Sequence, residues 1–166
     1  MRTDMATLPR PIPGRELDWR PLREGDLGYV AALEAQIHAS PWTIGNFRDA
    51  LAAGYSTRVV ERESRIVAYG VLMLSPGEAQ ILNLSVVPDA RREGLGRALL
   101  QHFVDDARRL RAEQIFLEVR TSNVRAIRLY ASEGFVLVAR RAGYYPDASG
   151  GAVREDALVM RLPLDA

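Results

Sequence analysis

The sequence contains no cysteine in its 166 residues. Disulfide bonds and thiolate-bound zinc are therefore excluded, and so is any mechanism that carries an acyl group on a cysteine. An excess of one charge is also missing, because 22 Lys and Arg residues stand against 21 Asp and Glu residues. A nearly neutral chain lacks the electrostatic footprint of a nucleic-acid-binding protein or of a membrane-surface protein.

Long hydrophobic runs are absent as well. No segment reaches the roughly 20 apolar residues that a transmembrane helix needs, and the first residues show no basic-then-apolar signal pattern. Residues 1–16, which include Pro9, Pro11 and Pro13, are predicted to be a loose extension. Residues 17–166 are predicted to form a single domain of ordinary size. We expect a cytoplasmic, monomeric protein.

Metal-ligating clusters are not evident either. The two histidines, His38 and His102, have no second ligand at a spacing typical of metal sites. Both lie in predicted helices among charged neighbours. The sequence therefore predicts no metal ion, and it predicts that both imidazoles lie at the surface.

The hydrophobic pattern predicts secondary structure in the order βααβββαβαββ. Apolar residues that alternate or run together predict strands, whereas apolar residues three and four apart predict helices. The predicted strands are 18–23, 56–61, 66–74, 79–87, 114–120, 135–141 and 156–162, and the predicted helices are 25–38, 44–53, 94–110 and 124–133. This order indicates an α/β (α+β) fold in which helices flank a mixed, mainly antiparallel central sheet.

The turn between residues 87 and 95 has the features of an anion-binding site. A predicted strand ends there, and two glycines, Gly94 and Gly96, open the next helix. The first helical turn leaves backbone N–H groups unpaired and carries partial positive charge. A phosphate can approach closely because glycine has no side chain. A dinucleotide fingerprint is excluded because Leu99 replaces its third glycine, and the Gly-Lys-Ser/Thr of a P-loop is absent. The alternative is an ordinary helix start with two glycines.

Two further residues are candidates for acid–base chemistry. Glu118 stands inside an apolar strand, where a carboxylate is costly unless it is partnered or has a raised pKa, so it is a candidate general base. The structural alternative is an ion pair with Arg120 or Arg125. Tyr130 lies seven residues after Asn123 and returns to nearly the same helix face. Its phenol is a candidate proton donor, and the alternative is a core tyrosine.

Together these segments resemble the GNAT acetyltransferase superfamily. Arg-x-x-Gly-x-Gly after Val-x-Pro resembles its acetyl-CoA pyrophosphate loop, and the pattern from Asn123 to Phe135 resembles its second acetyl-CoA segment. Leu-Glu-Val-Arg-Thr-Ser-Asn at 117–123 and Gly-Tyr-Tyr-Pro at 143–146 are similar to one branch, the bacterial ribosomal-protein-alanine N-acetyltransferases. This similarity extends over residues 18–162.

The resemblance implies direct transfer of acetyl from acetyl-CoA to an amine, with Glu118 as base and Tyr130 as acid. The implied acceptor is the N-terminal amine of a small-subunit ribosomal protein that begins with alanine, without direct nucleic-acid or membrane contact. Trp42, Tyr144 and Tyr145 are implied to lie beside the acceptor. The implied contacts with acetyl-CoA come from Leu84, Ser85, Val86, Arg91, Arg92, Glu93, Gly94, Leu95, Gly96, Arg97 and Asn123.

The residues leave two other functions open. The same chemistry can act on a lysine side chain or on a small-molecule amine, although no acidic cluster near Trp42 or Tyr144 marks a site for a polycation. Asp147, Glu155 and Asp156 are the exceptions to be considered. Alternatively, the chain is a regulatory module that binds coenzyme A without turnover. An enzyme needs Glu118 and Tyr130 for its activity, whereas a regulatory module keeps its cofactor affinity and its biological effect without them.

Overall fold

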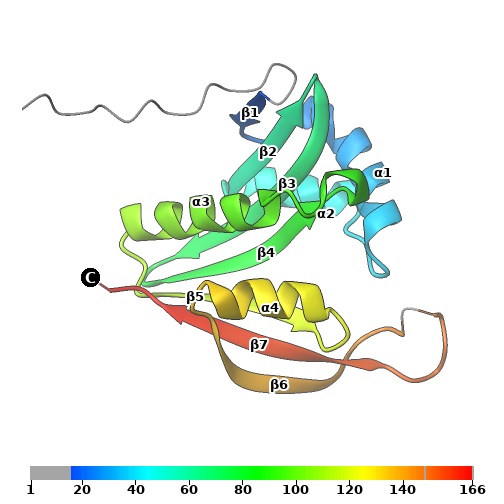
Figure 1. The fold of residues 1–166 in the computed structure, drawn as a ribbon, viewed down its shortest axis with the longest axis vertical. Coiled ribbons are helices and arrows are strands. Elements are labelled where there is room, and N and C mark those ends of the chain that lie inside the picture. The colour runs from blue at the N-terminus through cyan, green and yellow to red at the C-terminus, as the bar shows by residue number, and fades with distance from the viewer. Residues whose placement is uncertain (1–15, 148, 166) are drawn as a thin grey trace, which may run out of the picture.

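The computed structural model describes residues 16–147 and 149–165, which form one seven-stranded sheet with α-helices on both faces (Figure 1). The strand order across the sheet is β1-β2-β3-β4-β5-β7-β6. All neighbouring strands run antiparallel except β4 and β5, which are parallel. The predicted fold class is confirmed. The predicted extension lies outside the described residues, apart from Glu16. Within the described part of the chain, no helix has the length and apolar character needed to cross a membrane.

The strands and helices follow the predicted order. The strands are β1 (Leu17–Arg20), β2 (Ser56–Arg62), β3 (Arg65–Ser75), β4 (Glu78–Val86), β5 (Gln114–Arg120), β6 (Val136–Tyr145) and β7 (Glu155–Pro163). The helices are α1 (Leu27–Ile37), α2 (Ile44–Ala52), α3 (Leu95–Arg109) and α4 (Val124–Ser132), with 3-10 turns η1 (Glu24–Asp26) and η2 (Pro88–Ala90).

Three predicted boundaries differ from the structure by two or more residues. The strand predicted over residues 18–23 ends at Arg20. The helix predicted from Gly25 begins as the 3-10 turn η1 and becomes α-helical only at Leu27. Strand β6 continues past Arg141, where the predicted strand ends, to Tyr145. This extra length pairs Tyr145 with Glu155 of β7. It brings the Tyr-Tyr segment to the same end of the sheet as the carboxyl end of β5.

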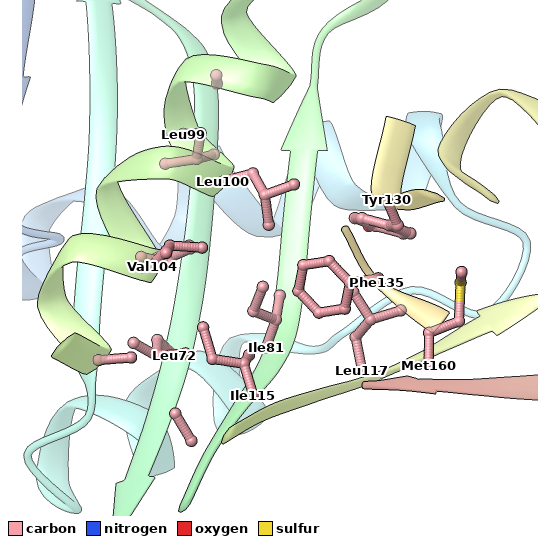
Figure 2. Close-up of a cluster of buried hydrophobic side chains, with 14 of the residues drawn as sticks. Leu72, Ile81, Leu99, Leu100, Val104, Ile115, Leu117, Tyr130, Phe135 and Met160 are labelled. Carbon is pink, nitrogen blue, oxygen red and sulfur yellow. The ribbon is translucent and has the colours of Figure 1, made fainter. Parts of the chain in front are cut away.

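The sheet is packed on both faces by apolar side chains. On one face, α3 and α4 cover the central strands; Leu99, Leu100, Val104 and Tyr130 pack with Leu72, Ile115, Leu117 and Met160 (Figure 2). On the other face, α1 and α2 cover β2 and β3, and Val30 and Phe47 pack with Val59 and Tyr69. Each face of the sheet therefore has its own buried cluster, and the central strands are held between the two clusters.

A β-bulge in β4 opens the sheet. Val71 of β3 pairs with Asn83, but the next residue, Leu72, pairs with Ile81, so Leu82 is an extra residue. The bulge reverses the side-chain alternation: Ile81 packs in the cluster under α3, whereas Asn83 hydrogen-bonds toward α1. The parallel pairing of β4 with β5 ends at Ile81, directly before the bulge. Beyond that point the facing edges of β4 and β5 do not pair with each other.

Candidate active site

A cavity of about 700 Å³ lies where β4 and β5 separate, between the first turns of α3 and α4. Most residues predicted to hold the acetyl donor line it. Glu93 does not line it, because its carboxylate forms an ion pair with Arg62 of β2. The predicted residues that line the cavity are Leu84, Ser85, Val86, Arg91, Arg92, Gly94, Leu95, Gly96, Arg97 and Asn123.

One end of this cavity has the chemistry of an anion site. Gly94 is the N-cap of α3, with a φ of +81° and no side-chain cap. The first hydrogen bond of the helix joins the Ala98 N–H to the Gly94 carbonyl at 3.0 Å. The N–H groups of the first turn therefore stay available at the positive end of the helix dipole. Arg91 and Arg92 line the same end. This donor set fits a diphosphate.

The β4 edge presents backbone donors to the cavity. The Val87 N–H donates to the Val67 carbonyl of β3 at 3.0 Å. Successive residues of a strand point their N–H groups to opposite edges, so those of Val86 and Leu84 point away from β3. Both residues line the cavity. An extended acyl chain laid along this edge meets N–H groups at alternate residues.

A second cavity of about 190 Å³ adjoins the first. Its lining includes Trp42, Glu118 and Tyr145. The two cavities share Leu84 and Tyr130, among other residues, so they meet at these side chains. Tyr144 lines neither cavity, but the neighbouring Glu118 carboxylate is the main reason why the pKa of Tyr144 is raised. The structure thus places Trp42, Glu118, Tyr130 and Tyr145 around the smaller cavity, with Tyr144 next to Glu118 outside it.

Glu118 has weak ionic partners and faces the smaller cavity. Its side chain is 16% exposed, and its Oε1 lies 3.4 Å from Nη2 of Arg141, an exposed residue of β6. Neither predicted partner forms this ion pair among the described residues: the Arg120 guanidinium binds Glu155 at 3.0 Å, and Glu118 pairs with Arg141 rather than with Arg125. The remaining oxygen lone pairs of Glu118 are therefore open to a group in the cavity.

Tyr130 combines a core ring with a hydroxyl at the junction. Its ring centroid lies 5.8 Å from that of Phe135 in the cluster of Figure 2, and the residue is only 7% exposed. Within residues 16–147 and 149–165 its hydroxyl makes no hydrogen bond. Burial raises the pKa of Tyr130 to about 12. The phenol is therefore protonated at neutral pH. The ring belongs to the core, as the structural alternative predicts, and the role of the hydroxyl as proton donor stays a prediction.

The two histidines, predicted to lie at the surface, are both partly exposed, and each makes a specific contact. His38 lines both cavities, and its Nε2 lies 2.7 Å from Oγ of Ser85. Its removal from water lowers the pKa of His38. His102 stacks on Trp19, with ring centroids 4.2 Å apart. Among the residues the structure describes, no group of His, Asp and Glu has the geometry to hold a metal ion.

Sequence reasoning missed a buried carboxylate beside the smaller cavity. Glu34 of α1 is 2% exposed and accepts hydrogen bonds from Tyr69 and Asn83. A signal was present, because Val30, Glu34 and His38 recur every four residues and so share one face of the helix. A charged residue on the buried face of an amphipathic helix indicates a partnered group.

Comparisons with known proteins agree with this arrangement. The Acetyltransferase (GNAT) family profile matches residues 16–135. The ribosomal protein bS18-alanine N-acetyltransferase of Escherichia coli K12 is 36% identical over 143 residues, which cover 86% of this chain and 95% of the relative. The crystal structure of the ribosomal-protein-S18-alanine N-acetyltransferase from Escherichia coli matches with a TM-score of 0.83 and 34% identity, covering 91% and 96% of the two chains. Ard1 from Thermoplasma volcanium matches with a TM-score of 0.81 and 28% identity, covering 90% and 99%.

Proposed function

Because this chain belongs to the GNAT acetyltransferase family and is an N-acetyltransferase, we propose that it uses acetyl-CoA to acetylate the N-terminal alanine of ribosomal protein bS18. The observation that carries the proposal is the junction at Tyr130, where an anion-binding cavity meets a smaller cavity that contains Glu118. A donor and an acceptor entering from the two sides meet there. We further propose that residues 17–166 act as one cytoplasmic, monomeric domain without direct nucleic-acid contact.

The larger cavity suits the donor substrate along its whole length. Acetyl-CoA supplies an acetyl group activated as a thioester. The first turn of α3 and the guanidinium groups of Arg91 and Arg92 would hold its diphosphate. The free β4 edge at Leu84 and Val86 would bind its amide-bearing arm and direct the thioester to Tyr130. Asn123, which caps α4 by accepting from the Ala126 N–H at 3.2 Å, would border the same arm.

The transfer then needs one proton acceptor and one proton donor. Glu118 removes a proton from the attacking amine as the C–N bond forms. The N–H groups of the β4 edge stabilise the negative charge that develops on the carbonyl oxygen. As the C–S bond breaks, Tyr130 donates a hydrogen bond to the departing sulfur. The thiolate takes its proton from solvent, and Glu118 releases to solvent the proton that it removed from the amine. No acyl-enzyme intermediate is involved, in keeping with the absence of cysteine.

The acceptor chemistry favours an α-amine over a lysine side chain. An α-amino group has a reference pKa near 7.7–8.0, so roughly a third of it is neutral at pH 7.5. A lysine amine, with a pKa near 10.4, is only about 0.1% neutral at that pH. An α-amine therefore enters the site as a neutral nucleophile far more often than a lysine amine does. A peptide terminus is therefore the better substrate for this site.

The pH dependence follows from these groups. We expect kcat/KM for a peptide that starts with alanine to rise as the α-amine loses its proton, with a midpoint near 7.7–8.0. The acid must stay protonated to work, and since the pKa of Tyr130 is about 12, activity should not decline below about pH 10. The measurement is kcat/KM from pH 6 to 10. A descending limb between pH 8.5 and 10 would exclude Tyr130 as the acid.

A glycine variant tests the donor site. Gly94 has a φ of +81° and no atom within 4 Å of the position that a Cβ would take, so Gly94→Ala introduces backbone strain without a clash. The alanine variant can relieve this strain of about 1–2 kcal/mol by changing its backbone conformation, which would turn the first-turn N–H groups away from the cavity. Binding of acetyl-CoA would then have to restore the strained conformation. We expect the Kd for acetyl-CoA to rise by about 5- to 30-fold.

The matched control is Gly77→Ala. Gly77 has a φ of +78° and equally open surroundings, but it lies in the turn between β3 and β4, far from the α3 N-terminus. Its variant should lose similar stability and keep the wild-type Kd in a calorimetric titration. Equal weakening of acetyl-CoA binding in both variants would show that general destabilisation, rather than the anion site, is responsible.

The proposal is tested by acetyl transfer to a peptide panel, with the modified nitrogen located by mass spectrometry. The panel contains peptides that start with Ala, Ser or Met, a peptide with a blocked terminus and an internal lysine, and a polyamine. We expect modification of free α-amines alone, with alanine preferred. Modification of the blocked peptide or of the polyamine would reassign the acceptor. Tight acetyl-CoA binding without any transfer would indicate a regulatory module.

A further inference from the structure

The buried carboxylate of Glu34 joins three separate parts of the fold. Its Oε2 accepts from the Tyr69 hydroxyl of β3 at 2.5 Å, and its Oε1 accepts from Nδ2 of Asn83 in β4 at 3.0 Å. Oε1 also accepts from the backbone N–H of Trp42, between α1 and α2, at 3.2 Å. A carboxylate that is 2% exposed requires such partners. Its position is therefore fixed by contacts rather than by water.

A second set of hydrogen bonds ties the same helix to β4. The Ser85 hydroxyl donates to Oδ1 of Asn83 at 2.8 Å, so its oxygen must accept from Nε2 of His38 at 2.7 Å. Nε2 therefore carries the proton in the neutral imidazole, whose pKa burial lowers. Nε2 also lies 3.6 Å from Oε2 of Glu34. The polar chain is continuous from α1 to the bulged part of β4.

This network fixes one wall of the smaller cavity. Ser40 and Trp42, in the connection between α1 and α2, line that cavity together with Asn83. The Trp42 ring packs against Phe47 with centroids 5.1 Å apart, but its backbone is held by Glu34. The same carboxylate oxygen holds Asn83. Glu34 thus determines the spacing between the Trp42 wall and the β4 wall.

We propose that Glu34 is a positioning residue that fixes the Trp42 wall of the acceptor cavity against β4 and so sets the affinity for the acceptor peptide. It acts through Trp42 and Asn83, because its oxygens are already engaged by three donors. The inference rests on the proposed function, since it assumes that a peptide enters the smaller cavity. The donor site depends on other elements, chiefly the α3 N-terminus.

The test compares two substitutions of Glu34 that conserve volume. Glu34→Met removes every acceptor and leaves the Trp42 N–H and the Asn83 amide unpaired, so the KM for the peptide should rise about ten- to a hundred-fold. The KM for acetyl-CoA should stay within about two-fold. Glu34→Gln keeps an amide oxygen for Trp42 and Asn83 and should restore most of the peptide affinity.

The matched control is Asp106→Leu. Asp106 of α3 is also a buried carboxylate, 6% exposed, but it binds Ser56 and Arg58 of β2 and lines neither cavity. This variant should lose stability without a change in either KM. If Glu34→Met does not fold, Tyr69→Phe removes one donor to the carboxylate and should raise the peptide KM by about two- to five-fold.

A second measurement, hydrogen exchange, tests the Trp42 wall of the cavity directly and needs no acceptor peptide. Hydrogen exchange of the Trp42 amide, which donates to Glu34, should be at least about ten-fold faster in Glu34→Met and unchanged in Asp106→Leu. An unchanged peptide KM, or parallel changes in Glu34→Met and Asp106→Leu, would overturn the inference. Failure of the wild type to modify any α-amine would instead overturn the proposed function, and faster exchange at Trp42 would still support the positioning role.

Discussion

Replacing Glu118 by glutamine should lower the turnover of an alanine-starting peptide by roughly 10²–10⁴-fold, the range expected for loss of a general base. Glutamine keeps the size of the side chain and its place in β5, but it cannot accept a proton. The KM for acetyl-CoA should be unchanged, because Glu118 lines the smaller cavity and not the larger one proposed for acetyl-CoA. The measurement is kcat under saturating substrates, together with a calorimetric Kd for acetyl-CoA.

The structure offers a control and an independent check for this variant. Glu61→Gln removes a carboxylate of β2 that pairs with Arg20 at 2.6 Å, outside both cavities, and should leave kcat unaltered. Glu118 raises the pKa of Tyr144, so Glu118→Gln should bring the pKa of that phenol down toward its ordinary value. If the pKa of Tyr144 falls as expected but the variant keeps more than about a tenth of the wild-type kcat, Glu118 is not the base.

The turn between residues 87 and 95 was predictable because the sequence signals that specify it are local. Pro88 opens a 3-10 turn, and Gly94 takes the positive φ that a side chain would strain. Apolar residues at helical spacing then begin α3 at Leu95. Each signal depends only on neighbours in the sequence. The order of strands and helices was predictable for the same reason, since hydrophobic periodicity is a property of each segment alone.

The opening between β4 and β5 was not predictable from such signals. The bulge at Leu82 carries no glycine, and the register shift arises only when β3 and β4 are paired. The sheet order also separates β5 from β6 by inserting β7 between them. Arg141 of β6 reaches Glu118 across that strand, so no spacing in the sequence pointed to this ion pair.

The network around Glu34 shows a different limit. Its helical spacing with His38 was visible in the sequence, but its partners Tyr69 and Asn83 lie 35 and 49 residues away along the chain. A charged residue on a buried helix face requires a partner, but the spacing does not say which one. The sequence placed His38 at the surface, and the residue is partly exposed, but its contact with Ser85 of β4 was missed because only neighbours on the same helix were considered.

Replacing Tyr130 by phenylalanine should lower kcat by about 10²-fold, near the lower end of the range for general acids. The pKa of Tyr130 is about 12, whereas a thiol has a pKa near 8.5, so complete proton transfer to the sulfur is uphill. The phenol contributes mainly by donating a hydrogen bond as negative charge develops on sulfur. The aromatic ring, which packs on Phe135, remains, and the Tm should barely change.

Tyr55→Phe is the control, because Tyr55 is a half-buried tyrosine beside α2 that lines neither cavity. It should keep full activity. Activity of Tyr130→Phe within about three-fold of wild type would remove the acid from the mechanism. The double variant with Glu118→Gln decides whether the two groups act together. Residues that act as a unit have non-additive effects, so its loss should be smaller than the product of the single losses, whereas a full product would mean independent contributions.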